Sequence, residues 1–412
     1  MSDSGSDNTT ASEQGKVVNG RVEVRLGETK LGLNYTFYRG EGARFLPMRD
    51  GMAAPDALAR LVLDGWMPDE PFIAPDTTIV AFGSCFAGHI GRYLSNLGFD
   101  VATRKDDKAY VSKLGDGIVN VFAIRQQFEW AWEGLSPSVE LWHGYKAEEF
   151  GYDEDVRGRT RELFDAADVF IITLGLSEIW YDEPTGEVFW RAVPFDKFDP
   201  ARHKFRVASS AETLDNLRRI HDLIRKHRPE AAIVFTVSPI PLSATFRPVS
   251  CVTASSASKA LLRGAVDELY RERRPDDPKL FYYPAYEVVT QCFDRPFGDD
   301  FRHPLFHVLD VNMKAFERYF CRTGLTDADL AAVFEEAKRL DRALGLEDSG
   351  PLRQYIDDML ASWSAQTKGP NKFGAEDRET KLARKEELRR ERALQKASRI
   401  AEKTAGADKE PS

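Results

Sequence analysis

The stretch from residue 78 to residue 97 constrains the fold of this chain more than any other. It begins with a short apolar run over residues 79–82, as expected of a buried strand. Three small residues, Gly-Ser-Cys at 83–85, come next, and apolar residues then recur at helical spacing up to Leu97. The pattern predicts a strand that turns directly into a helix. The turn side chains then lie at the C-terminal edge of a sheet, in front of a helix N-terminus.

A turn of this kind is a suitable place for a nucleophile. The partial positive charge of a helix N-terminus lowers the pKa of a nearby thiol and stabilises an anion that develops there. Cys85 is therefore a candidate nucleophile, and Ser84 is the alternative beside it.

Further apolar runs near residues 101–103, 168–174, 231–238 and 281–283 alternate with helical patterns. This alternation predicts an α/β fold, a three-layer α/β/α sandwich around a mainly parallel sheet. In such folds ligands bind at the C-terminal edge of the strands.

The sequence Gly-Ser-Cys-Phe-Ala at residues 83–87 resembles the GSCFA domain family, which is itself similar to the SGNH, or GDSL-type, hydrolases. The resemblance extends over about residues 76–325 and includes Asp-Asp-x-x-His-Pro at residues 299–304. In SGNH enzymes the first strand ends in Gly-Asp-Ser, and the serine attacks an ester. Aligned on Gly83, Cys85 takes the place of that serine and Ser84 takes the place of the aspartate. The resemblance thus implies an SGNH-like fold with Cys85 as nucleophile.

The resemblance also implies the partners of the nucleophile. Asp300 and His303 match the Asp-x-x-His block, in which the histidine takes the proton of the nucleophile and the carboxylate orients the ring. Two other histidines compete for the role of base. His89 lies one helical turn after Cys85, and His307 is expected to face solvent or the core.

Four residues are candidates for binding the oxyanion or the substrate. The family resemblance implies that Gly115 or Gly117 supplies a main-chain N–H, and it places Ser177 where SGNH enzymes carry an oxyanion-hole asparagine. Asn120 belongs to the same segment as the two glycines. The alternatives are that Asn120 and Ser177 cap the helices expected after them.

Composition narrows the classes of partner. The net charge of −9 argues against nucleic acid, and no apolar run is long enough to span a bilayer. The four cysteines show no Cys-x-x-Cys pairing, and the N-terminus lacks a secretory signal, which together indicate reduced thiols and a cytoplasmic location. A metal site could be built from Asp299, Asp300, His303 and His307, but no further cluster of metal-ligating residues accompanies them elsewhere in the sequence. Neither a metal nor another cofactor is therefore expected.

The organisation expected from the sequence has five parts. Residues 1–16 are polar and predicted to be disordered, residues 17–75 form a lead-in segment, and residues 76–325 form the α/β domain. Appended helices over residues 326–363 and a charged, solvated helical tail over residues 364–412 complete the chain.

These features predict an acyl-transfer enzyme, an esterase, deacylase or O-acyltransferase, acting on a small-molecule or saccharide acyl substrate. Two alternatives stay open: a hydrolase with Ser84 as nucleophile, and a non-catalytic module that binds saccharides or proteins. The sequence leaves the acyl group, the acceptor and the oligomeric state open.

Overall fold

The computed structural model describes residues 44, 46–47, 49–106, 108–113, 117–140 and 153–344, together with the backbone of three strands between residues 17 and 34. The chain divides into two compact units, Met1–Leu352 and Arg353–Ser412. Residues 1–16 and 345–412 lie outside the described residues, so the predicted disorder of residues 1–16, the part of the appended helices beyond residue 344 and the charged tail over residues 364–412 stay predictions.

The central sheet is parallel and contains β4 (Ile79–Phe82), β5 (Val169–Leu174), β8 (Ala232–Val237) and β9 (Leu280–Tyr282) in the order β4-β5-β8-β9. Every residue of these four strands is buried. Such strands must be covered on both faces, which explains their continuous apolar sequences.

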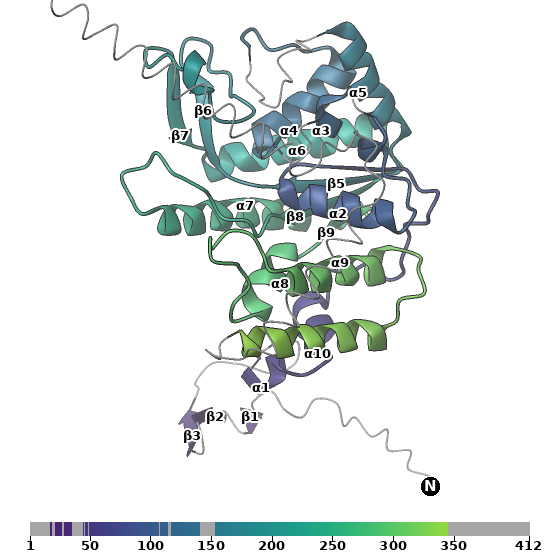
Figure 1. Ribbon diagram of the computed structural model, residues 1–412, viewed down its shortest axis with the longest axis vertical. Helices are drawn as coiled ribbons and strands as arrows, with labels where there is room; N and C mark the ends of the chain where they lie inside the picture. Colours follow the sequence, from purple (N-terminus) through teal and green to yellow (C-terminus); the bar gives the residue numbers. More distant parts are fainter. Residues whose placement is uncertain are drawn as a thin grey trace, which may run out of the picture. The chain divides into compact units, whose positions relative to one another are not determined.

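Helices cover both faces of the sheet and form two separate apolar cores (Figure 1). Side chains alternate along each strand, so that Val80 and Phe82 enter one core while Ile79 and Ala81 enter the other. The first core contains residues of α4 (Val121–Phe128), α5 (Glu154–Ala166), α6 (Ser210–His227) and α7 (Cys251–Arg273). The second contains residues of α2 (Cys85–Asn96), α8 (Ala285–Cys292), α9 (Phe306–Phe320) and α10 (Asp327–Ala343). The predicted three-layer sandwich is confirmed.

Several short helical elements connect these layers. They are α1 (Arg49–Met52), α3 (Tyr110–Lys113), π-helices at Leu58–Leu63 and Glu129–Glu133, and 3₁₀ helices at Ala102–Arg104 and Phe195–Lys197.

The strand expected at residues 101–103 is reduced to a single bridge between Val101 and Ile79. A 3₁₀ helix, Ala102–Arg104, follows at once. The side chain of Thr103 takes over the contact with β4: its hydroxyl lies 3.2 Å from the carbonyl of Ala81 and 3.4 Å from its N–H. A side-chain hydroxyl therefore replaces the main-chain ladder at this edge.

The apolar sequence that contains the last expected strand continues to Val289, but only Leu280–Tyr282 form the strand. The ladder ends where Tyr283 donates its N–H to Phe235, and residues from Ala285 on form α8. Pro284 lacks the N–H that a further ladder bond requires. Helix α7 begins at Cys251, so that Ser258 lies inside it.

Two smaller sheets are separate from the central sheet. β6 (Glu178–Asp182) and β7 (His203–Val207) are antiparallel and were not expected from the sequence. In the lead-in segment, where a single edge strand was expected, β1 (Val17–Val18), β2 (Arg21–Leu26) and β3 (Thr29–Asn34) form a three-stranded antiparallel sheet.

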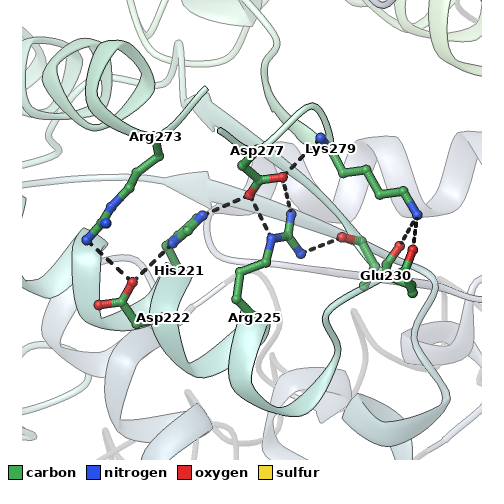
Figure 2. Close-up of polar contacts among 8 residues, drawn as sticks. His221, Asp222, Arg225, Glu230, Arg273, Asp277 and Lys279 are labelled. Atoms are coloured by element: carbon green, nitrogen blue, oxygen red, sulfur yellow. Dashed lines mark hydrogen bonds and ion pairs between the residues drawn. The ribbon is translucent and has the colours of Figure 1, made fainter. Parts of the chain in front are cut away.

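A charged cluster ties α6 to the segment before β9, at the edge of the sheet where the strands begin (Figure 2). Arg225 binds the carboxylate of Asp277 with two donors, at 2.7 and 3.0 Å, and the Nε2 of His221 contacts it at 2.9 Å. Burial acts to raise the pKa of Asp277, but the hydrogen bonds from His221 and Arg225 outweigh it and hold the pKa well below its usual range. The outer ion pairs join Asp222 to Arg273 and Glu230 to Lys279.

Replacing Asp277 by asparagine should lower the free energy of unfolding by about 2–4 kcal/mol at neutral pH, because Arg225 and His221 lose a buried charged acceptor. The pKa of Asp277 is depressed in the folded state, so its contribution is present above the ordinary carboxylate pKa of about 4 and is lost as the pH falls. Urea unfolding at several pH values should therefore show the difference between wild type and variant shrinking in acid.

The neighbouring Asp276 supplies a matched control because it is exposed. Asp276→Asn should change stability by less than about 0.5 kcal/mol. Equal effects of the two substitutions would show that the Asp277 cluster is not a stabilising contact.

Candidate active site

The turn after β4 is held by an exceptionally close approach of Gly83 to β5. Gly83 has a φ of +130°, and a Cβ added to it would lie 2.1 Å from the carbonyl oxygen of Thr173. The next residue, Ser84, donates its N–H to the same oxygen at 3.1 Å. Only glycine fits this position, which explains why the strand ends in Gly-Ser-Cys.

Ser84 and Cys85 have different roles in this turn. Ser84 is the N-cap of α2: its hydroxyl accepts the N–H of Phe86 at 3.2 Å, and the residue is only 4% exposed. Cys85 is the first residue of the helix and is exposed. The thiol is therefore the accessible one of the two candidate nucleophiles, and it lies at the positive end of a helix dipole.

The segment that contains Gly117 and Asn120 packs against the end of β5. Gly175 donates its N–H to the carbonyl of Val119 at 2.8 Å, and a Cβ on Gly175 would lie 2.8 Å from the Cβ of Val119. Gly117 lies under a side chain, since its Cβ would meet the guanidinium of Arg191 at 3.0 Å. Gly115 falls outside the described residues.

Asn120 is buried and acts as a structural link. Its side-chain oxygen accepts the N–H of Ala123 at 2.8 Å and caps α4, while its amide nitrogen donates to the carbonyls of Phe189 and Trp190. Asn120 is therefore the N-cap of α4, as the alternative interpretation of the sequence expected.

Ser177 follows β5 and is 2% exposed. Its N–H donates to the hydroxyl of Ser258 at 2.9 Å, and the two hydroxyls lie 3.1 Å apart. The idea that Ser177 caps a helix is wrong, because the next element is the strand β6. Ser177 is instead fixed by α7, from a residue 81 positions later in the chain.

Asp300 and His303 form a local pair in the loop before α9. One carboxylate oxygen of Asp300 accepts the N–H groups of Arg302 and His303, each at 3.0 Å, and the other contacts Nδ1 of His303. The main-chain N–H groups of His303 and Arg302, followed by the His303 ring, hold the pKa of Asp300 well below its usual range. An ionised Asp300 favours a proton on Nδ1, which leaves Nε2 as the basic nitrogen of His303.

Strained backbone marks the same loop. Phe301 has a φ of +54°, and its side chain is 81% exposed. A bulky residue in the left-handed region is unusual and is found most often at functional sites. The side chains of Asp300 and His303 are exposed as well.

The sheet topology brings these segments to one edge. Cys85, Ser177 and the loop after β8 all follow the C-terminal ends of adjacent parallel strands. Arg302 donates to the carbonyl of Pro241, in the loop after β8, at 3.4 Å, which places the Asp300–His303 loop beside that edge.

The competing histidines have other environments. His307 is buried in α9 between Phe293 and Phe306, and burial lowers its pKa to about 4. His89 is half-buried on α2.

Among the residues that the structure describes, no group of three or more His, Cys, Asp or Glu side chains is arranged to hold a metal ion.

The sequence model of the GSCFA family matches residues 78–316, which is more than half of the chain. The chain belongs to the GSCFA family. The matched region of this GSCFA protein runs from the first strand of the central sheet into α9 and includes Cys85, Ser177, Asp300 and His303.

Other comparisons add little to the family assignment. No curated protein matches the chain. Among the solved structures, a carbohydrate esterase family 2 enzyme with a carbohydrate-binding domain, from Corynascus thermopiles (Myceliophthora fergusii), is 18% identical. The match covers 44% of this chain and 38% of that protein, with a TM-score of 0.18.

In the part of the GSCFA protein that the structure describes, no helix is both long and apolar enough to cross a membrane.

Lys259 is the residue at this edge that the sequence interpretation missed. It lies in α7 and is 3% exposed, and its ammonium group donates to the carbonyl of Gly175 at 2.6 Å. Burial, with a further contribution from the charge of Arg302, lowers the pKa of Lys259 to about 7. A signal was present in the sequence: Lys259 precedes Leu262 by three residues and Val266 by seven, which places it on the apolar face of its helix.

Proposed function

We propose that this GSCFA protein is an acyl-transfer enzyme in which Cys85 attacks an acyl carbonyl. The proposal depends mainly on one observation in the turn after β4. Ser84 caps helix α2, whereas Cys85, the first residue of that helix, is exposed. The N-terminus of α2 favours negative charge on the thiol, and a thiolate is the reactive form of cysteine.

His303 is the proposed base, and Asp300 is the residue that orients it. The contact between Asp300 and Nδ1 of His303 supports this assignment, because it leaves Nε2 to accept the thiol proton and later to return a proton to the leaving group. The proposal requires the Nε2 of His303 to come within hydrogen-bonding reach of the Cys85 sulfur, and their common location at one edge of the sheet is compatible with this.

The main-chain N–H of Cys85, an N–H of Gly115 or Gly117 and the hydroxyl of Ser177 are the proposed oxyanion donors. Ser258 fixes the position of Ser177, since it accepts the N–H of Ser177 and lies within hydrogen-bonding distance of its hydroxyl. The hydroxyl of Ser177 donates to that of Ser258 in this structure, and in the proposed role it donates to the oxyanion instead.

The proposed substrate is a small molecule or saccharide that carries an acyl group. Hydrolysis results if water reaches the acyl-enzyme, and transfer results if an alcohol does so. A non-catalytic binding module is the second candidate. The low exposure of Ser177 and its contact with Ser258 favour it, because a buried hydroxyl that already has a partner is a weak oxyanion donor.

Alkylation of the thiols tests the proposal without knowledge of the substrate. At neutral pH, iodoacetamide should modify Cys85 at least about tenfold faster than an unstructured cysteine peptide. Peptide mass spectrometry can follow each thiol separately. Burial raises the pKa of Cys292 to about 12 and also raises that of Cys321, so both should react slowly.

Cys251 is the internal control, because it is half-buried and donates its thiol to the carbonyl of Leu242. Cys251→Ser should leave the rate at Cys85 unchanged. A Cys85 that reacts no faster than the reference peptide would argue against an activated nucleophile and for the binding module.

A further inference from the structure

We infer that Lys259 and Arg302 form a subsite for a negatively charged oxyanion group, a carboxylate or a phosphate or sulfate, on the molecule that binds at this edge of the sheet. The inference rests on the proposed function where it assigns this group to the acyl substrate, and it goes beyond that function by naming the charge of the substrate.

The first observation is a buried lysine that has no carboxylate partner among the residues that the structure describes. Lys259 is 3% exposed, and within the described part of the chain no carboxylate pairs with it. Its hydrogen-bond partner is a neutral group, the carbonyl of Gly175. Buried charges in proteins are normally paired, because an unpaired one loses its hydration without compensation.

The second observation is that the charged group near Lys259, the guanidinium of Arg302, is also positive. Lys259 contacts Gly175, directly after β5, and Arg302 contacts Pro241, in the loop after the adjacent strand β8, so the two side chains reach neighbouring strand ends. The charge of Arg302 accordingly contributes to the lowered pKa of Lys259. The Nε of Arg302 donates to the carbonyl of Pro241, and among the described residues no carboxylate forms an ion pair with its guanidinium. Two nearby like charges repel each other, and an anion bound near both removes this repulsion.

The location of the pair is the third observation. Gly175 is two residues before Ser177, and Arg302 directly precedes His303, so both cations adjoin segments that carry the proposed catalytic groups. Arg302 is half-buried, between the exposed residues Phe301 and His303, so it is partly accessible to solvent. A planar guanidinium with several donors, next to an ammonium group, is the chemistry that binds oxyanions.

Recognition of an anionic group would give Lys259 and Arg302 a role, which the catalytic proposal does not. Acyl transfer by Cys85 and His303 requires neither a buried lysine nor a second cation. A substrate with an anionic group would be held by Lys259 and Arg302 while its acyl group faced the thiol. The inference therefore selects acylated acids, or acylated molecules that carry phosphate or sulfate, over neutral acyl esters.

Anion binding can be measured on a protein that cannot turn over. Isothermal titration of the full-length Cys85→Ala variant with sodium sulfate, and separately with sodium acetate, should give saturable binding beyond that of sodium chloride at equal ionic strength. Sulfate stands for a phosphate or sulfate group and acetate for a carboxylate, so the tighter of the two identifies the group. Adding Lys259→Met or Arg302→Gln should weaken binding at least tenfold.

Two controls keep the result interpretable. Lys279→Met removes an exposed lysine at the opposite edge of the sheet and should leave anion affinity unchanged. Circular dichroism and a thermal melt show whether Lys259→Met is folded, and Arg302→Gln tests the same subsite from a partly exposed position. Equal affinity in the parent and both subsite variants, or no binding beyond chloride, would overturn the inference. Because Cys85 is absent, failure here is separate from failure of the proposed chemistry.

Discussion

Replacing Gly83 by alanine should lower the free energy of unfolding by roughly 3–5 kcal/mol and abolish any activity of Cys85. The added Cβ would lie 2.1 Å from the carbonyl oxygen of Thr173, and the φ of +130° is one that alanine rarely adopts. Neither problem can be relieved without moving the end of β4 away from β5. Denaturant unfolding measures the first effect, and the rate of Cys85 alkylation reports whether the turn has moved.

Gly264 is the matched control, because it is exposed inside α7 and a Cβ there would meet no atom within 4 Å. The same change, Gly264→Ala, should stabilise the protein by about 0.5–1 kcal/mol, since alanine favours a helix more than glycine does. If Gly83→Ala were as well tolerated as Gly264→Ala, Gly83 could not lie as close to Thr173 as the structure places it.

Removing the thiol should have the largest effect on function. After incubation with an activated acyl ester such as p-nitrophenyl acetate, intact-protein mass spectrometry should show an acyl adduct on the wild type and none on Cys85→Ala. The reason is that an acyl-enzyme requires the nucleophile itself. Cys85→Ser should retain at most a trace, because a hydroxyl depends entirely on His303 for its activation.

Ser84→Ala separates the two candidate nucleophiles. Loss of the N-cap hydroxyl should cost about 1 kcal/mol of stability and reduce acylation only modestly. The opposite pattern, an inactive Ser84→Ala and a normal Cys85→Ala, would make the protein a serine enzyme with a shifted motif. Absence of an adduct from all variants, the wild type included, would favour the binding module.

Local features of the site were accessible to sequence reasoning. The strand–turn–helix around Gly83 follows from one apolar run, one glycine and helical periodicity. Asp300 and His303 are three residues apart, so their contact needs only a local turn. The three-layer sandwich follows from buried strands that alternate with helices.

Sequence reasoning failed where a side chain decides between two backbone conformations. The hydroxyl of Thr103 replaces a strand ladder beside Ala81, and no periodic pattern records such an exchange. Likewise, apolar residues from Ala285 on suit a strand or a buried helix equally well, and Pro284 ends the strand before them.

The sequence by itself determined the order of the elements and the identity of the reactive candidates, because these depend on spacing along the chain. The need for glycine at residue 83 comes from its contact with Thr173 on the neighbouring strand, which only the tertiary structure shows. Only the tertiary structure decided that Ser258 holds Ser177 and that Lys259 lies without a carboxylate partner among the described residues, near Arg302. These contacts join residues 81 positions apart in one case and more than forty in the other. They depend on which strands pair and how α7 packs, and a charge on an apolar helix face becomes a buried cation only after that packing excludes water.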